Sequence, residues 1–245
     1  MVRHPDMDTN MTKTQTNTKT KPQRAAGSNA SSSDKRLQGK RICALFTSGV
    51  ELLEFTEPVE GLREAGAEVV VVGLDEAPIK TWNMTEWDRS ITPDMGLAEA
   101  AHQEWDALFL PGGPLNADVL RSTDMAVFFV NEYFFKRDKP VGAMCHSPWM
   151  MVEADVLRGR TMTCYPAIAT DMRNAGAIWV NRAAVVDGNL VTARHPADTP
   201  EFIPAFIDLI ATYEPSKTET SEHMKRSFTP KDEDPKTGPS AQPGA

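Results

Sequence analysis

Apolar residues occur along the chain in short continuous runs and in stretches with helical spacing. Continuous runs predict strands that are buried on both faces, at 41–46, 68–74, 105–110, 140–144, 162–164, 178–180, 183–186 and 190–193. Helical spacing predicts helices at 51–65, 97–102, 124–136, 148–157, 168–175 and 199–212. Strands that alternate with helices in this way predict an α/β fold with a mostly parallel sheet between helices.

The order of these elements favours a flavodoxin-like, doubly wound sheet. Asp187–Asn189 lies between two apolar runs and predicts a hairpin turn. Residues 77–95 contain Trp82 and Trp87 and are predicted to be irregular, as a packed flap or as part of a pocket wall. Sites of doubly wound sheets lie beyond the carboxyl ends of the strands, which here selects the loops at 47–51, 111–116 and 145–148.

Composition divides the chain of 245 residues into three parts. Residues 1–38 and 214–245 are rich in small, polar and charged residues, so both are predicted to be disordered tails. Residues 39–213 are predicted to form one domain, which is long enough to bury a substantial core.

Charge and apolar content narrow the class of partner and the compartment. The formal net charge is −8 and the N-terminal tail is basic, so the predicted domain is more acidic than the whole chain. Such a domain is not expected to bind nucleic acid or an anionic membrane. No apolar run reaches the length of a membrane span or of a signal peptide, and the three cysteines fit a reducing compartment. We therefore expect a cytoplasmic protein.

Cys145 is the strongest candidate for chemistry, because it falls where a buried strand turns into a helix that begins near Pro148. A sharp strand-to-helix turn presents a nucleophile at the sheet edge. The helix N-terminus beneath the sulfur is expected to lower the thiol pKa. Cys43 and Cys164 lie in apolar runs and are expected to be inert core residues.

Each neighbour of this turn has a functional and a structural interpretation. His146 is either a base for the thiol or a residue that borders the helix, and its peptide N–H can donate to an oxyanion. Gly112 and Gly113 form either a tight turn or a close backbone approach, with the Gly113 N–H as a second donor. Glu51 complements the helix dipole or reaches the thiol.

Two further glutamates, Glu54 and Glu57, are expected to be solvated helix residues. We find no metal-ligand spacing and no phosphate-binding loop, and expect neither a metal nor a cofactor.

The motifs TSGVELLE, DALFLPGGPLNADVLR, KPVGAMCHSPWMMVEADVLRGRTMTCYPAIATDMRNAGAIWV and VVDGNLVTARHPAD are similar to those of one family. Over residues 40–211 the chain resembles the PfpI-like intracellular proteases of the DJ-1/PfpI superfamily, which are related to type 1 glutamine amidotransferase domains. The resemblance implies a flavodoxin-like sandwich that assembles as a dimer or hexamer.

The resemblance also implies roles for individual residues. Cys145 matches the nucleophile, His146 its adjacent histidine, and Glu51 the glutamate that hydrogen-bonds the cysteine. Gly113 and the His146 amide match the oxyanion donors, beside Gly112. Asp118 falls where some relatives place an acidic residue that reaches the histidine of a neighbouring subunit. Ser147 stands where relatives have glycine, so it either crowds the pocket or adds a donor.

These features predict a cysteine-dependent, stress-related enzyme that acts on a small carbonyl or a peptide. The family includes peptidases, glutathione-independent glyoxalases and protein deglycases, and the residues do not choose among them. The alternative is a redox sensor or chaperone that uses oxidation of Cys145 without turnover. An amidotransferase-like site, with His195 as the distant histidine, is a third interpretation.

Overall fold

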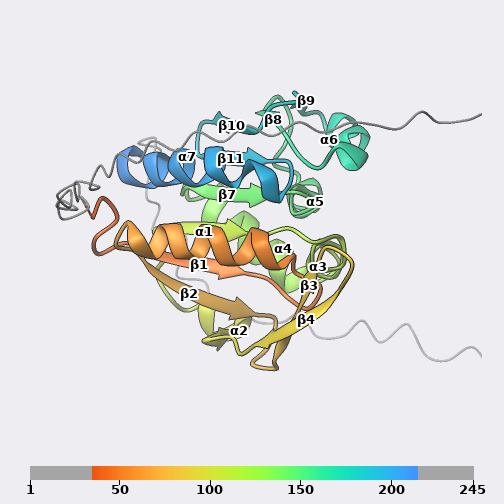
Figure 1. The fold of residues 1–245 in the computed structure, drawn as a ribbon. Coiled ribbons are helices and arrows are strands. Elements are labelled where there is room, and N and C mark those ends of the chain that lie inside the picture. Colours follow the sequence, from red (N-terminus) through yellow and green to blue (C-terminus); the bar gives the residue numbers. More distant parts are fainter. Residues whose placement is uncertain (1–34, 215–245) are drawn as a thin grey trace, which may run out of the picture. The chain divides into compact units, whose positions relative to one another are not determined.

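The computed structural model describes residues 35–214, which form an α/β sandwich around a seven-stranded sheet (Figure 1). The strand order is β10-β11-β7-β6-β1-β2-β5, and every pair is parallel except β10 with β11. The strands are β1 (Arg41–Leu45), β2 (Glu68–Gly73), β5 (Met95–Gly96), β6 (Ala107–Leu110), β7 (Val141–Met144), β10 (Ala184–Asp187) and β11 (Leu190–Ala193). The predicted fold class and the hairpin turn between β10 and β11 are confirmed.

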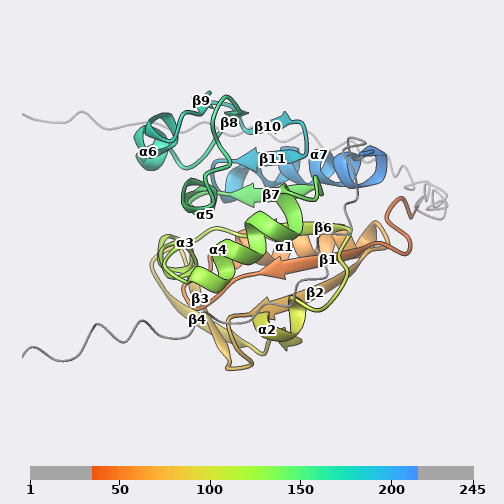
Figure 2. The same ribbon diagram turned by 180° about the vertical axis from the view of Figure 1, so that it is seen from behind.

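Helices cover both faces of the sheet. One face carries α1 (Leu52–Glu64) and α7 (Thr199–Thr212), which lie side by side in Figure 1. The other face, turned to the viewer in Figure 2, carries α2 (Leu97–Ala100), α3 (Pro114–Arg121), α4 (Asp124–Val130) and α5 (Pro148–Glu153). A π-helical turn at Asn131–Phe135 continues α4, and α6 (Ala169–Asn174) follows the 3-10 turn at Pro166–Ile168.

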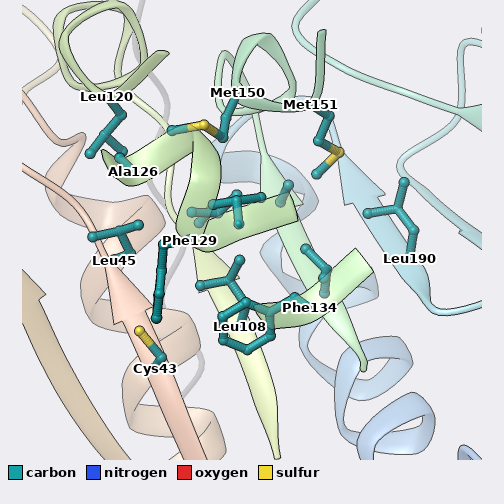
Figure 3. Packing of buried hydrophobic residues seen from close by; sticks show 14 of the residues in the cluster. Cys43, Leu45, Leu108, Leu120, Ala126, Phe129, Phe134, Met150, Met151 and Leu190 are labelled. Atoms are coloured by element: carbon teal, nitrogen blue, oxygen red, sulfur yellow. The ribbon is translucent and has the colours of Figure 1, made fainter. Parts of the chain in front are cut away.

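The core has one apolar layer on each face of the sheet. Phe129 and Phe134 press against the face under α4, as Figure 3 shows, and each is 1% exposed or less. Phe202 and Phe206 of α7 fill the opposite layer with Phe109. Continuous apolar strands therefore place large side chains alternately in the two layers, as buried parallel strands require.

A hairpin replaces the irregular segment that was predicted at 77–95, so that prediction is wrong. β3 (Ile79–Asn83) and β4 (Glu86–Ile91) pair in an antiparallel ribbon outside the central sheet. Nearly all of β4 is exposed, so polar and charged residues occupy both of its faces and hide the strand pattern. Trp82 and Trp87 face each other across the ribbon, edge to face, with ring centroids 5.3 Å apart.

Three other elements were missed or shortened. α3 was not predicted, although Pro114 stands at its first turn, where proline is favoured. The predicted strands at 162–164 and 178–180 reduce to β8 (Thr161–Met162) and β9 (Ile178–Trp179), which pair with each other outside the central sheet.

The folded part begins before the predicted boundary at residue 39. Leu37 is fully buried, and its peptide N–H donates to the Ala65 carbonyl at 2.8 Å. The predictions for residues 1–34 and 215–245 lie outside the described residues. None of the helices within residues 35–214 is long and apolar enough to cross a membrane.

Candidate active site

The three loops selected from the sequence meet at one edge of the sheet. They follow β1, β6 and β7, which are adjacent parallel strands and so end side by side. Backbone hydrogen bonds join them: the Glu51 N–H donates to the Gly112 carbonyl at 3.2 Å. Asn116, which is fully buried, accepts from the Thr47 N–H at 2.7 Å and donates to the Gly112 carbonyl at 3.1 Å. This linking role of Asn116 was not predicted.

Cys145 occupies the predicted sharp turn between β7 and α5. Its φ of 60° lies in the left-handed region, which non-glycine residues rarely adopt. The Cys145 N–H still pairs with the Ala193 carbonyl of β11 at 2.9 Å, so the strand holds the turn from below. Such strain persists only where the surroundings impose it, and it is concentrated at functional sites.

The predicted lowering of the Cys145 pKa is wrong. Cys145 is 6% exposed, and burial raises the pKa of its thiol well above the ordinary value. The negative charge of Glu54 raises this pKa further, whereas N–H groups of Gly113 and His146 that hydrogen-bond the sulfur lower it. A helix of only six residues follows, and its dipole does not outweigh burial beside a carboxylate.

The carboxyl group that lies against Cys145 belongs to Glu54, which was expected to be solvated. Its side chain is fully buried. Burial raises the Glu54 pKa to about 8, although the Cys145 thiol and the Gly112 N–H partly oppose this. Within the described part of the chain, neither carboxyl oxygen meets a partner at good hydrogen-bond geometry. A protonated carboxyl group is therefore the favoured state near neutral pH.

The sequence does contain a signal for the burial of Glu54. Glu54, Pro58 and Leu62 recur every four residues and are all buried, so they form one face of α1, and Val50, four residues before Glu54, is also buried. A glutamate within such an apolar row is a candidate for a site residue rather than a solvated one.

Glu51, the glutamate chosen from the sequence, contacts the β3–β4 hairpin instead. Its carboxylate oxygens accept from the Met84 N–H at 3.3 and 3.4 Å, and the residue is 7% exposed. Met84 has a φ of 55° at the tip of the hairpin. The expected contact between Glu51 and the thiol is thus replaced by the contact of Glu54.

His146 lies against the sulfur as expected, with Nδ1 3.2 Å from the Cys145 Sγ. Its ring stacks on Tyr165, with centroids 4.7 Å apart, and lies 5.2 Å from the Trp149 ring. Burial lowers the His146 pKa, so its neutral form, which can accept a proton, is favoured near neutral pH. Neither Tyr165 nor Trp149 was predicted to be a site residue.

The glycine pair permits a close backbone approach. Gly113 has a φ of 100°, and a side chain at Gly112 would overlap the Glu54 carboxyl group and the Cys145 side chain. Ser147 is 2% exposed, and its hydroxyl donates to the Pro111 carbonyl. The Ser147 hydroxyl therefore donates to the loop that follows β6.

Two candidates lie away from the sulfur. Asp118 on α3 is exposed and pairs with Arg121 at 3.0 Å, so its expected role across a subunit boundary stays a prediction. His195 has Nδ1 3.7 Å from Asp198, whereas the histidine at the sulfur is His146. No group of three or more metal-ligating side chains occurs within residues 35–214.

Comparisons with known proteins identify the family of this chain. The pattern of the DJ-1/PfpI family matches residues 40–209. The Escherichia coli protein named protein/nucleic acid deglycase 2 is 40% identical over 164 residues, which cover 66% of this chain and 93% of that protein.

Solved structures show the same likeness. Drosophila melanogaster DJ-1beta superposes with a TM-score of 0.65 at 27% identity, over 70% of this chain and 90% of that one. A two-domain Anabaena variabilis protein with DJ-1/ThiJ/PfpI-like and ferritin-like domains gives a TM-score of 0.63 at 39% identity. That match covers 69% of this chain and 47% of the larger one. With a strained cysteine, a buried glutamate and a histidine at one sheet edge, the chain belongs to the DJ-1/PfpI family.

Proposed function

We propose that the protein is a cysteine-dependent enzyme that removes carbonyl-derived adducts from glycated amines or consumes the parent dicarbonyl. One observation carries the proposal: the Cys145 sulfur meets a buried carboxyl group, a neutral imidazole and two N–H groups at once. Inert core cysteines lack such surroundings. Cys43, for comparison, is fully buried within β1, and burial alone dominates the rise of its pKa.

The first chemical step follows from these positions. The sulfur adds to a carbonyl carbon, so an S–C bond forms while the C=O π electrons move to the oxygen. The thiol proton passes to the His146 Nδ1, 3.2 Å away. The N–H groups of Gly113 and His146, which point at the sulfur at rest, donate to the new oxyanion. His146 then returns its proton to that oxygen, which leaves a neutral hemithioacetal.

A thiol with a raised pKa fits this step only if its proton leaves as the bond forms. His146 supplies the base, because burial keeps it neutral. Protonated Glu54 places a neutral carboxyl group beside the sulfur rather than a second negative charge. The arrangement therefore favours transfer of the thiol proton to His146 as the sulfur attacks, rather than a thiolate that forms before the substrate binds.

The substrate class is proposed from the named relative. The Escherichia coli protein is a protein/nucleic acid deglycase by name, and at 40% identity it extends the substrates beyond small carbonyls. The acidic composition predicted no nucleic-acid partner. We include glycated nucleic acid among the proposed substrates. A deglycase needs only to contact the adduct during the reaction, and this does not require a basic surface that binds nucleic acid stably.

The redox-sensor alternative is supported less well. Peroxide reacts with the thiolate, and oxidation follows thiolate character and exposure. Cys145 is 6% exposed and its pKa is raised, so both properties disfavour selective oxidation.

An activity panel on the wild type and on Cys145→Ala tests the proposal. The substrates are methylglyoxal, glycated protein, glycated DNA and an unmodified peptide. We expect turnover of at least one carbonyl-derived substrate, and its fall to the uncatalysed level in Cys145→Ala, because the nucleophile is gone. Cys43→Ala is the matched control and is expected to keep its activity.

Turnover that persists in Cys145→Ala would overturn the proposal. Turnover of the peptide alone would instead support the peptidase interpretation. Selective oxidation of Cys145 at low peroxide, measured by mass spectrometry in a protein that is inactive on the whole panel, would support the sensor.

A further inference from the structure

Two buried glutamates stand one turn apart at the start of α1. Glu51 is the N-cap residue and Glu54 lies in the first turn, with exposed fractions of 7% and 0%. The Glu51 carboxylate accepts from the Met84 N–H of the β3–β4 hairpin, and its charge acts on the neighbouring Glu54 carboxyl group. Of these two glutamates, only Glu54 contacts the Cys145 thiol, so Glu51 has no part in the proposed chemistry.

The surroundings decide which of the two carboxyl groups ionises first. Burial raises the Glu51 pKa, but N–H groups of Met84 and Leu52 hydrogen-bond its charged form and oppose the rise. Glu54 is buried more deeply, and its oxygens lack a partner at good geometry among the described residues. As the pH rises, Glu51 therefore loses its proton before Glu54 does.

The other groups that face Glu54 do not replace this charge. Asp198, from the segment before α7, also acts on Glu54, but its carboxylate is bound by Arg194 at 2.8 Å and neighbours His195. Cys145 and the Gly112 N–H face Glu54 from the other two loops. No ion pair to a lysine or arginine offsets Glu51 within residues 35–214, where its partners are backbone N–H groups.

We propose that Glu51 is a positioning residue whose fixed negative charge keeps the Glu54 carboxyl group protonated beside the Cys145 sulfur. The Met84 N–H at the tip of the β3–β4 hairpin holds that charge in place. The hairpin is thereby connected to the site through an interaction that involves no substrate. The meaning of a protonated Glu54 for catalysis rests on the proposed function, whereas the charge coupling does not.

The test is an infrared titration of the protonated carboxyl band of Glu54, which Glu54→Gln identifies by removing it. In the wild type we expect the band to disappear with a midpoint near pH 8. In Glu51→Gln, whose side chain still accepts from Met84, the midpoint is expected about one pH unit lower, because the neighbouring charge is gone. Glu60→Gln removes one charge from the exposed side of the same helix and is expected to leave the midpoint unchanged.

Glu51→Asp keeps the charge, so its midpoint is expected to stay nearer the wild-type value; it also serves if Glu51→Gln does not fold. A midpoint in Glu51→Gln equal to that of the wild type, or a midpoint that moves equally in Glu51→Asp and Glu51→Gln, would overturn the inference. The titration needs no turnover, so a failed activity panel leaves its outcome intact. If the activity panel gives the expected turnover but the midpoint of Glu51→Gln equals that of the wild type, the inference about Glu51 is wrong and the proposed function stands.

Discussion

Glu54→Gln is expected to make the protein more stable at pH 8 and to change its stability little at pH 4.5. The folded protein holds the Glu54 proton up to a pKa of about 8, whereas an ordinary glutamate releases it near 4.5. Between these values the folded state binds more protons than the unfolded state, so the wild type loses stability as the pH rises. Glutamine carries no such proton, and the variant avoids the loss.

The size of this effect follows from the same two values. Each pH unit between 4.5 and about 8 is worth about 1.4 kcal/mol, which gives an upper limit of about 5 kcal/mol. Urea unfolding of both proteins at several pH values measures the difference, and effects of other groups cancel between them. Glu60→Gln, at an exposed position of the same helix, is the control for the loss of a carboxylate. A difference between Glu54→Gln and wild type that is constant from pH 4.5 to 8 would contradict a buried, protonated Glu54.

The same substitution is expected to reduce turnover while it stabilises the fold. If the fold becomes more stable when Glu54 is replaced, then Glu54 is retained for activity rather than for stability. Such a trade-off between stability and activity is common at functional sites. This distinguishes Glu54 from core residues such as Phe134, whose truncation removes buried apolar area and lowers stability at every pH.

The sheet and the loops of the site were predictable because buried parallel strands show as continuous apolar runs. β6 and β7 have that property along their whole length, and β1 has it from Ile42 onward. Their carboxyl ends then identified the loops that hold Cys145, Gly113 and Glu51 without knowledge of the tertiary structure. The exposed strand β4 has no buried face, so neither it nor the hairpin contact of Glu51 was predictable in the same way.

The electrostatics of the site was not predictable, because it depends on the rotation of α1 and on burial depth. The spacing of Glu51 and Glu54 does not show which of them faces the sulfur, because residues three apart lie on similar sides of a helix. Sequence spacing located a helix start beneath Cys145, and the dipole alone favours a thiolate. The opposite direction of the pKa follows from the neighbouring carboxyl group and from the loss of water around the thiol.

Gly113→Ala is expected to lower both stability and turnover. The loss is expected to be larger than that of a Gly→Ala substitution at a position where an added Cβ meets no other atoms. Its φ of 100° disfavours a side chain, which costs about 1–2 kcal/mol. An added Cβ would also overlap the Gly49 carbonyl and approach the Glu51 peptide nitrogen, both backbone atoms of the β1–α1 loop. Overpacking of this kind costs about another 1–3 kcal/mol, because backbone does not move aside as a flexible side chain does.

Gly159→Ala separates these two contributions. Gly159 has a φ of 78°, and nothing lies within 4 Å of an added Cβ, so only the backbone strain applies. Urea unfolding is expected to give a loss of about 1–2 kcal/mol for Gly159→Ala and about 2–5 kcal/mol for Gly113→Ala. Turnover is expected to fall in Gly113→Ala alone, since the displaced Gly113 N–H would no longer meet the sulfur and the oxyanion that forms beside it. Equal stability losses with full turnover in both variants would mean that the close approach of the two loops does not position this N–H group.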